Sequence, residues 1–318
     1  MHRVSLVLLS FALLVLVGAG ASSAARSAPT KSLITPSPAY TDDQLSAPAG
    51  DNWLSFMGSL NGHRYSSLTQ ITPGNVSTLK EAWHIHLGTC ATHDAKCGSL
   101  ESNAVVADGT YYIQTPKSDV FALNAATGAT IWHYDPNPQY TAEGFNVESG
   151  GRQPGVAIAD GKVFAGRTDG YLVALDQMLG GELWKTEALS WKKGGRVSDA
   201  PIYFHGMVIT GDSGGDFGSP SNSMQAFDAA TGARIWQWTV IPRPGQPGSN
   251  SWAPQTGGGH SYGGGALWES PLIDPKNNLA IFGTGNTEPW NSRGPGKNLW
   301  TDSIVALNVF TGQLVWGY

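Results

Sequence analysis

The fold is decided by a stretch of thirteen residues, Val-Phe-Ala-Leu-Asn-Ala-Ala-Thr-Gly-Ala-Thr-Ile-Trp at residues 120–132, which recurs along the chain. Related stretches occupy residues 172–184, 224–236 and 304–316, and each of them ends in tryptophan. Each contains a short apolar strand, a turn that starts with Asp or Asn and includes Gly, and a second strand. An Asp or Asn side chain can bond to its own backbone and Gly adopts a positive φ, so each stretch predicts a β-hairpin.

The recurring tryptophans set the length of the repeat. Trp83 precedes the first complete stretch, and the five tryptophans at positions 83, 132, 184, 236 and 316 are 49, 52, 52 and 80 residues apart. A unit of about 50 residues with several short strands has the length of one propeller blade. We therefore predict an all-β propeller with about four to five blades in this chain, in which these tryptophans wedge between adjacent blades and are not site residues.

Composition agrees with an all-β chain and excludes one class of protein. The 318 residues carry a formal net charge of −5, only 14 % are charged, and there are 41 Gly, 19 Pro and 12 Trp. An acidic balance excludes a basic nucleic-acid-binding protein, and we expect no nucleic-acid partner. Two cysteines cannot form a zinc ribbon or an iron–sulfur site.

The N-terminus predicts export. Met1-His2-Arg3 is followed by an apolar run over residues 4–17 and by Ala19-Gly20-Ala21, the pattern of a signal peptide over residues 1–21. Residues 22–48 are rich in Ala, Ser, Thr and Pro and predict a flexible linker, so the propeller domain is expected to occupy residues 49–318. No other segment is apolar enough to cross a membrane, and a periplasmic or extracellular location is expected. Export would also permit a disulfide between Cys90 and Cys97.

Insertions mark the expected binding face. The distance from the end of the preceding strand to the tryptophan is 18 residues in the first two units, 25 in the third and 33 in the fourth. The extra residues fall in the same turn, at residues 212–218 and 284–291, and a further Gly/Pro-rich insertion covers residues 242–265. Insertions at one point of a repeat lie on one face, which is often the binding face.

Two short motifs suggest other chemistry. Gly-Asp-Ser-Gly-Gly at residues 211–215 has the pattern of a hydrolase nucleophile, but a nucleophile elbow needs a following helix and the next segment is a repeat strand. His84 and His86 would share one face of a strand and could supply two metal ligands, but no third is identifiable, which favours solvent-facing histidines.

Asp216 and Asn286 are the candidate metal ligands. Both carry oxygen ligands, and both lie in inserted turns on the same predicted face. A carboxylate and an amide carbonyl suit a hard cation such as Ca²⁺, although two ligands are too few for a complete site. The alternative, that each side chain only caps its own turn, stays open.

Several segments together resemble the quinoprotein alcohol dehydrogenases, which use pyrroloquinoline quinone (PQQ). These are Asn-Gly-His-Arg-Tyr-Ser at 61–66, the four Thr-Gly and Trp units, Gly-Gly-Asp-Phe-Gly at 214–218, and Gly-Thr-Gly-Asn-Thr-Glu-Pro-Trp-Asn at 283–291. The resemblance covers residues 50–318 and implies an eight-bladed propeller that holds PQQ on its axis beside Ca²⁺ or a lanthanide. It also implies oxidation of a small alcohol by hydride transfer to PQQ, with an electron acceptor such as a c-type cytochrome.

The resemblance also assigns site residues. Asn286 matches the family's asparagine ligand to the metal, and Asp216 stands where the family has a glutamate ligand. Trp268 matches the tryptophan on which the quinone stacks. The remaining matches to the PQQ surroundings are Glu101, Arg152, Ser198, Ser213, Gly214 and Gly215.

The chain departs from the family pattern in ways that bear on activity. The family's adjacent cysteines would fall just before Arg152, where this chain has Glu148-Ser-Gly-Gly151, and the family's catalytic aspartate follows the segment that matches residues 316–318. We therefore expect the N-terminal part of an alcohol dehydrogenase-like quinoprotein, inactive by itself and without a catalytic residue of its own. The alternative is a propeller that has lost catalysis and serves as a binding or assembly scaffold.

Overall fold

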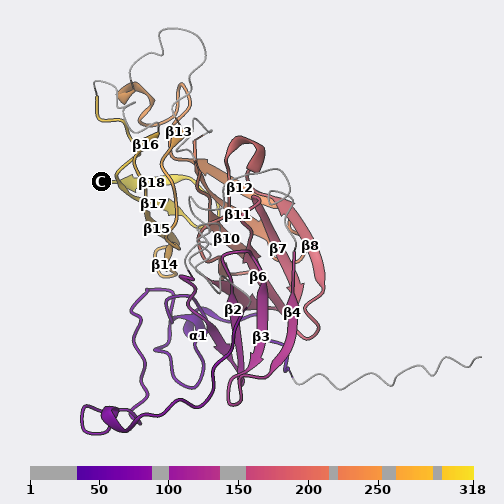
Figure 1. The fold of residues 1–318 in the computed structure, drawn as a ribbon. Helices are drawn as coiled ribbons and strands as arrows, with labels where there is room; N and C mark the ends of the chain where they lie inside the picture. The colour runs from indigo at the N-terminus through magenta and orange to yellow at the C-terminus, as the bar shows by residue number, and fades with distance from the viewer. Residues whose placement is uncertain (1–33, 88–99, 137–154, 215–220, 253–262, 289–295) are drawn as a thin grey trace, which may run out of the picture. The chain divides into compact units, whose positions relative to one another are not determined.

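The computed structural model describes residues 34–87, 100–136, 155–214, 221–252, 263–288 and 296–318, and these residues are almost entirely β-structure (Figure 1). They form four antiparallel sheets of four strands, each built from strands close together in the sequence. The first sheet contains β1 (Val105–Ala107), β2 (Thr110–Gln114), β3 (Val120–Asn124) and β4 (Thr130–Tyr134). The second contains β5 (Val156–Ala159), β6 (Lys162–Gly166), β7 (Tyr171–Asp176) and β8 (Glu182–Glu187).

The third and fourth sheets repeat this arrangement. The third contains β9 (Ile202–Phe204), β10 (Met207–Gly211), β11 (Ser223–Asp228) and β12 (Arg234–Thr239). The fourth contains β14 (Leu272–Asp274), β15 (Leu279–Gly283), β17 (Ile304–Asn308) and β18 (Leu314–Gly317). Within the described ranges, the remaining elements are short: α1 (Asp42–Ser46), the 3-10 turns Val76–Thr78, Trp191–Lys193 and Ser249–Ser251, and the paired strands β13 (Gly263–Gly264) and β16 (Thr287–Glu288). The all-β, propeller-type repeat predicted from the sequence is confirmed.

The turn between the third and fourth strands of each sheet folds as its sequence predicts. In the first sheet, the Asn124 side chain accepts hydrogen bonds from the backbone of Ala126 and Thr127, both at 3.0 Å. Gly128 closes the turn with a φ of 72° and donates to the Asn124 carbonyl at 2.8 Å. Asp176, Asp228 and Asn308 hold the corresponding turns of the other three sheets in the same way. Local turn chemistry therefore sets the register of all four hairpins.

The recurring tryptophans join each sheet to the next one. Each of four indoles donates its Nε1–H to a carbonyl in the following unit's turn. The pairs are Trp83 with Ala125 (3.1 Å), Trp132 with Gln177 (2.9 Å), Trp184 with Ala229 (3.2 Å) and Trp236 with Val309 (3.0 Å). Each indole also lies on that turn's glycine, where a Cβ atom would come within 2.6–2.7 Å of the ring; these glycines are Gly128, Gly180, Gly232 and Gly312. The predicted wedge role is confirmed for these four tryptophans.

A β-bulge occurs at the same place in every sheet. The register of β3 and β4 shifts between Ala122, which faces Trp132, and Leu123, which faces Thr130. The same shift follows Ala174, Ala226 and Ala306 in the other sheets. The small alanine leaves room for the indole opposite, and the bulge adds local twist to the outermost strand.

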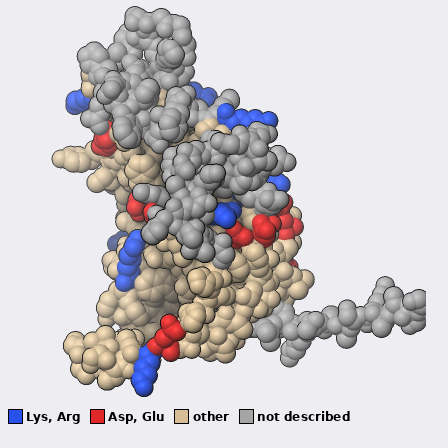
Figure 2. All heavy atoms as spheres, viewed as in Figure 1, with Lys and Arg blue, Asp and Glu red and all other residues tan. Residues whose placement is uncertain are grey.

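The core lies where the sheets face each other. The inner strands are buried along most of their length, as in Val-Ala-Ile-Ala of β5 and Met-Val-Ile-Thr-Gly of β10. The sequences of these strands are therefore mostly runs of apolar residues, without the alternation of apolar and polar residues that a half-exposed strand shows. On the face shown in Figure 2, charged side chains are scattered and form no large basic patch.

Residues 34–48 differ from the flexible linker predicted for residues 22–48. Ile34 and Leu45 are buried, at 5 % and 4 % exposure, and the Ser37 backbone donates to Gln177 Oε1 at 2.7 Å. Thr41 caps α1 through a capping box with Gln44. The apolar residues are too sparse to show a period, but they pack against the sheets. The predicted signal peptide and Cys90 and Cys97 lie outside the described residues. In the described part of the chain, no helix is long and apolar enough to span a membrane.

Candidate cofactor and metal site

Two inserted turns and the segment at the end of the third insertion meet through backbone hydrogen bonds. They join the turn after β10, the segment around residue 266 and the turn after β15. The bonds run from Leu267 N to Asp212 O (3.0 Å), from Gly265 N to Asn286 O (2.7 Å) and from Gly285 N to Ala266 O (2.9 Å). Sheet pairing of β13 with β16 extends this junction. Segments that are up to 74 positions apart in the sequence are therefore joined by backbone hydrogen bonds into one junction.

Ser198 and Ser213 are in direct contact at this junction. Ser198 Oγ donates to Ser213 Oγ at 2.5 Å, and the two side chains are nearly buried. Two backbone hydrogen bonds of 2.9 Å between Arg196 and Ser213 hold the segments together. The family resemblance names both serines, and in the structure the two side chains are in contact.

Gly214 is required by packing within the protein. Its φ is 103°, and a Cβ atom would come 1.8 Å from the Gly194 carbonyl oxygen. Asn222 Nδ2 donates to both Asp212 Oδ1 and the Gly214 carbonyl, each at 3.0 Å. The glycine therefore allows two loops to approach closely, a reason that is independent of any ligand.

Trp268 lies against the turn that carries Asn286. The Trp268 side chain is 43 % exposed, and a Cβ built on Gly285 would lie 3.5 Å from its indole ring. The amide nitrogen of Asn286 donates to the Thr287 carbonyl at 3.0 Å, which fixes the orientation of the side-chain amide. An accessible flat ring thus lies against Gly285, the residue that precedes Asn286.

Four further predicted site residues are Glu101, Arg152, Gly215 and Asp216. Glu101 is exposed and precedes Ser102, whose Oγ accepts from the Gln114 backbone at the end of β2. Arg152, Gly215 and Asp216 lie outside the described residues. Among the described residues, Ser198 contacts Ser213 directly, and backbone hydrogen bonds join the segments that carry Ser213, Trp268 and Asn286.

The hydrolase and histidine–metal alternatives gain no support. Ser213 Oγ is paired with a second serine, and the described segment that follows, β11, is a strand. His84 and His86 are both exposed, and His84 Nδ1 lies 2.9 Å from Glu81 Oε1. No group of three or more potential metal-ligating side chains of the His, Cys, Asp and Glu types occurs among the described residues.

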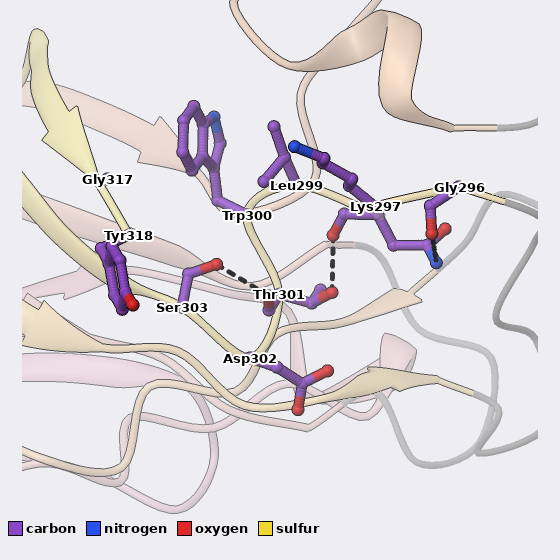
Figure 3. A pocket seen from close by; sticks show the side chains of 10 residues that line it. Gly296, Lys297, Leu299, Trp300, Thr301, Asp302, Ser303, Gly317 and Tyr318 are labelled. Atoms are coloured by element: carbon purple, nitrogen blue, oxygen red, sulfur yellow. Dashed lines mark hydrogen bonds between the residues drawn. The ribbon is translucent and has the colours of Figure 1, made fainter.

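A cleft of about 660 Å³ lies beside the junction (Figure 3). Its wall is the segment from Gly296 to Ser303, together with Gly317 and Tyr318. Asp302 N donates to the Gly285 carbonyl at 3.0 Å, so the cleft wall is bonded directly to the turn that carries Asn286. Figure 3 shows aromatic, hydroxyl and charged side chains around the cleft.

Comparison with known proteins identifies the family. The family described as glucose/ethanol/alcohol dehydrogenase, beta-propeller domain, with the short name PQQ, matches residues 53–318. The chain belongs to the PQQ-dependent alcohol dehydrogenase family. The dehydrogenase subunit of the quinone alcohol dehydrogenase from Gluconacetobacter polyoxogenes is 35 % identical over 290 residues, covering 84 % of this chain and 38 % of that protein. The quinohemoprotein alcohol dehydrogenase of Comamonas testosteroni is 36 % identical over 269 residues, covering 80 % and 37 %.

Solved structures agree with this family and its propeller. The Comamonas testosteroni enzyme superimposes with a TM-score of 0.72 at 33 % identity, covering 84 % of this chain and 41 % of that one. A europium-containing methanol dehydrogenase superimposes with the same TM-score at 28 % identity, covering 84 % and 48 %. This PQQ-family chain thus spans less than half the length of these relatives.

Two buried carboxylates were missed by the sequence analysis. Asp199 and Asp212 follow and precede the two site serines, and both are fully buried. Asp212 accepts hydrogen bonds from Asn222 Nδ2, Ser223 N, Ser223 Oγ and Gln225 Nε2, at 2.5–3.0 Å. Burial nevertheless raises the pKa of Asp212 to about 6, and it raises the pKa of Asp199 well above its usual value. The only sequence signal for this pair is that each aspartate lies next to an apolar strand. Their burial depends on residues that are distant in the sequence, so the signal does not reveal it.

These pKa values predict how stability changes with pH. The folded chain keeps a proton on Asp212 up to about pH 6, whereas the unfolded chain loses it near 3.8, so this group stabilises folding at low pH. That contribution is lost as pH rises from about 4 to 6, and is roughly 3 kcal/mol for a shift of about two pH units. We expect Asp212→Asn to remove it, which urea unfolding at pH 4 and pH 7 would measure as a difference from wild type.

A second variant provides the control for this experiment. Hydrogen bonds from Thr231 lower the pKa of Asp228, so its contribution is lost as pH falls. Asp228→Asn should therefore change the pH dependence in the opposite sense. Equal pH dependence in wild type and Asp212→Asn would contradict the assignment.

Proposed function

We propose that this chain forms the PQQ- and metal-holding part of an exported alcohol dehydrogenase of the quinoprotein type. The observation that supports the proposal is the junction of the inserted segments, whose backbone hydrogen bonds join the stretches that carry Ser213, Trp268 and Asn286. These are the residue types that a planar, acidic quinone and an oxygen-binding cation need. The relatives' names supply the substrate class, an alcohol.

The donor set fits the cofactor by its chemistry. The exposed Trp268 ring offers a flat apolar surface for stacking, while the two serine hydroxyls and Arg152 would bond carboxylate groups. Asn286 and Asp216 would supply oxygen ligands to the cation, either Ca²⁺ or a lanthanide. When bound, PQQ supplies the acceptor of the hydride from the alcohol, and the cation supplies a Lewis acid beside it.

Within this arrangement the residues of this chain hold the cofactor and the cation in position, and they take no covalent part in the reaction. The Gly285–Ala266 and Gly265–Asn286 hydrogen bonds hold Trp268 and Asn286 in register with each other. The hydrogen bonds that the Asp212 carboxylate accepts hold the adjacent residues Ser213 and Gly214 in place. A c-type cytochrome as electron acceptor and a periplasmic location belong to the same proposal.

A binding titration tests the proposal directly. PQQ is titrated into the chain with Ca²⁺, with a lanthanide or with EDTA, and binding is followed by tryptophan fluorescence and PQQ absorbance. We expect metal-dependent binding that Asn286→Ala weakens roughly ten- to hundred-fold, and that Trp268→Ala weakens with or without metal. Asn277→Ala is the matched control, since Asn277 is exposed and bonds only the local Asp274 carboxylate.

The outcomes separate the two functions considered for the chain. Metal-dependent PQQ binding that is lost in Asn286→Ala and kept in Asn277→Ala supports the dehydrogenase-type site. A folded chain that binds no PQQ under any of the three conditions would overturn the proposal and favour a scaffold.

A further inference from the structure

Three of the predicted site residues occupy the same position in different repeats. Glu101, Ser198 and Trp268 each lie six residues before the end of the first strand of their sheet, which is β1, β9 or β14. These first strands lie at the centre of the fold, since β1 contacts β5 and β5 contacts β9 although the three belong to different sheets. The segments that lead into the central strands therefore carry the candidate cofactor contacts, and the spacing of these segments sets the spacing of the contacts.

Two residues further along, the same segments touch one another through four small or polar residues. Ser270 Oγ donates to the Ala200 carbonyl at 2.7 Å. A Cβ atom built on Gly155 would lie 2.7 Å from the Asn103 carbonyl oxygen and 3.8 Å from the Ala200 Cβ. Each of the four residues lies four positions before the end of its first strand. We call Asn103, Gly155, Ala200 and Ser270 the inner row, and its contacts run from the first sheet to the fourth.

Phe56 packs against the inner row. Asn103 Nδ2 donates to the Phe56 carbonyl at 3.4 Å, and a Cβ built on Gly155 would lie 3.6 Å from the Phe56 ring. Phe56 also belongs to one buried apolar cluster with Met57 and Ala200, and only 6 % of it is exposed. Phe56 therefore lies at the members of the row that come from the first three sheets.

The segment that carries Phe56 is bonded to the sheets on both sides of it. Trp53 pairs with Val106 of β1 through two backbone hydrogen bonds of 2.8 and 2.9 Å. The Leu60 carbonyl accepts a hydrogen bond from Ile273 N of β14 at 2.9 Å. The segment thus connects the first sheet to the fourth, and these backbone bonds hold the Phe56 ring in place against the inner row.

We propose that Phe56 is a positioning residue for the cofactor site, where it sets the spacing of the segments that carry Glu101, Ser198 and Trp268. The assignment of these three residues to PQQ belongs to the proposed function, so the role of Phe56 rests on that function. Each of the three lies two positions from a member of the inner row, at most about 7 Å along the chain. A displacement of the row therefore moves the cofactor contacts.

Removal of the Phe56 ring would cause such a displacement. Surrounding segments relax only partly into the cavity that a large-to-small substitution leaves in a packed core. A misplacement of about 1 Å at a binding site can cost roughly a hundred-fold in function. Truncation of Phe56 is therefore expected to weaken cofactor binding although Phe56 itself is not assigned to the cofactor.

A PQQ titration with two matched variants tests this role. PQQ is titrated with Ca²⁺ into the full chain, into Phe56→Ala and into Phe121→Ala, and binding is followed by PQQ absorbance. Phe121 is 8 % exposed and packs with Ile113 and Leu123 in a separate cluster. We expect the PQQ dissociation constant to rise roughly ten- to hundred-fold in Phe56→Ala. It should stay within about two-fold in Phe121→Ala, because sites that share no partners act independently.

Two further measurements separate positioning from a loss of stability. The urea unfolding midpoints of Phe56→Ala and Phe121→Ala should fall alike, because each variant loses the same buried ring. Phe56→Leu and Phe121→Leu serve if either alanine variant does not fold. Leucine keeps an apolar side chain at the row, so we expect Phe56→Leu to bind PQQ within about five-fold of wild type but more weakly than Phe121→Leu.

Hydrogen exchange gives a readout that does not depend on PQQ. Backbone amides of residues 101–104, 196–200 and 266–270 should exchange at least about ten-fold faster in Phe56→Ala, and at the wild-type rate in Phe121→Ala. If the wild-type chain binds no PQQ, the proposed function fails, and the exchange rates still decide whether Phe56 fixes these segments. Unchanged exchange there, or equal PQQ affinity in the two alanine variants, would overturn the role of Phe56.

Discussion

Replacing Gly180 by valine is expected to lower the free energy of unfolding by roughly 2–5 kcal/mol. Two effects combine at this position. The φ of Gly180 is 74°, a conformation that costs a β-branched residue about 1–2 kcal/mol or more. A Cβ atom there would also lie 2.7 Å from the ring of Trp132, and overpacking of this kind typically costs about 1–3 kcal/mol.

The neighbouring glycine is a matched control. A Cβ on Gly181 would have no atom within 4 Å, and its φ lies outside the left-handed region. Gly181→Val should therefore change stability by less than about 1 kcal/mol. Urea unfolding followed by tryptophan fluorescence gives both values. If the two variants were equally stable, the contact between Trp132 and its turn would not hold the first two sheets together.

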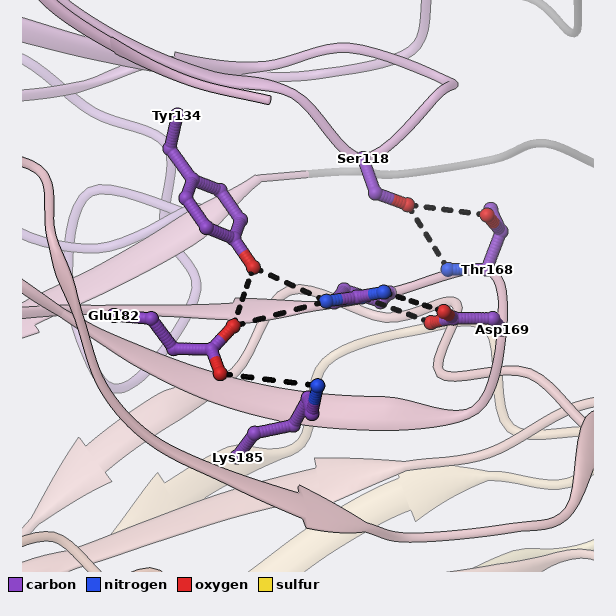
Figure 4. A network of polar contacts seen from close by, with 7 residues as sticks. Ser118, Tyr134, Thr168, Asp169, Glu182 and Lys185 are labelled. Carbon is purple, nitrogen blue, oxygen red and sulfur yellow. Dashed lines mark hydrogen bonds and ion pairs between the residues drawn. The ribbon is translucent and has the colours of Figure 1, made fainter. Parts of the chain in front are cut away.

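Arg167→Ala is expected to cost about 3–5 kcal/mol. Arg167 lies in the turn after β6 and forms two hydrogen bonds with the Asp169 carboxylate, at 2.9 and 2.5 Å (Figure 4). It also donates to Tyr134 OH at 3.1 Å. The side chains of Arg167 and Asp169 are only 6 % and 5 % exposed, so the variant leaves a buried carboxylate without its cation.

A nearby exposed ion pair is a control that separates the effect of burial from the effect of charge. Lys185 Nζ lies 3.8 Å from Glu182 Oε1, and the Lys185 side chain is 41 % exposed. Lys185→Ala should cost about 0.5 kcal/mol or less. The double variant Arg167→Ala/Asp169→Ala should lose less stability than the two single variants together, because no buried charge remains unpaired. A large loss in Lys185→Ala or simple additivity would contradict this account.

Local sequence signals predicted most of the fold. The Asx-to-Gly turns, the apolar strands around them and the wedge tryptophans each act within about fifteen residues or between adjacent units, so the repeat alone reveals them. Residues 34–48 were misjudged because Ile34 and Leu45 pack on residues distant in the sequence and show no period.

The candidate site was predicted in part. Inserted turns located the junction of residues 212–214, 264–268 and 285–286, and the family resemblance supplied individual residues within it. Asp199 and Asp212 were missed, since nothing in their immediate sequence shows that Thr210, Asn222 and Gln225 would surround them. A buried polar cluster is set by tertiary partners, and single-sequence reasoning has no access to those.

Each sheet carries both halves of the contact that joins it to its neighbours, a glycine turn for the preceding indole and an indole for the following turn. Gene duplication of one whole unit of about 50 residues would therefore insert a blade with both junctions already satisfied. Duplication of half a unit would leave an indole or a glycine turn without its counterpart. The structure thus favours growth of such genes in whole repeats, with no new contact residue needed at either boundary.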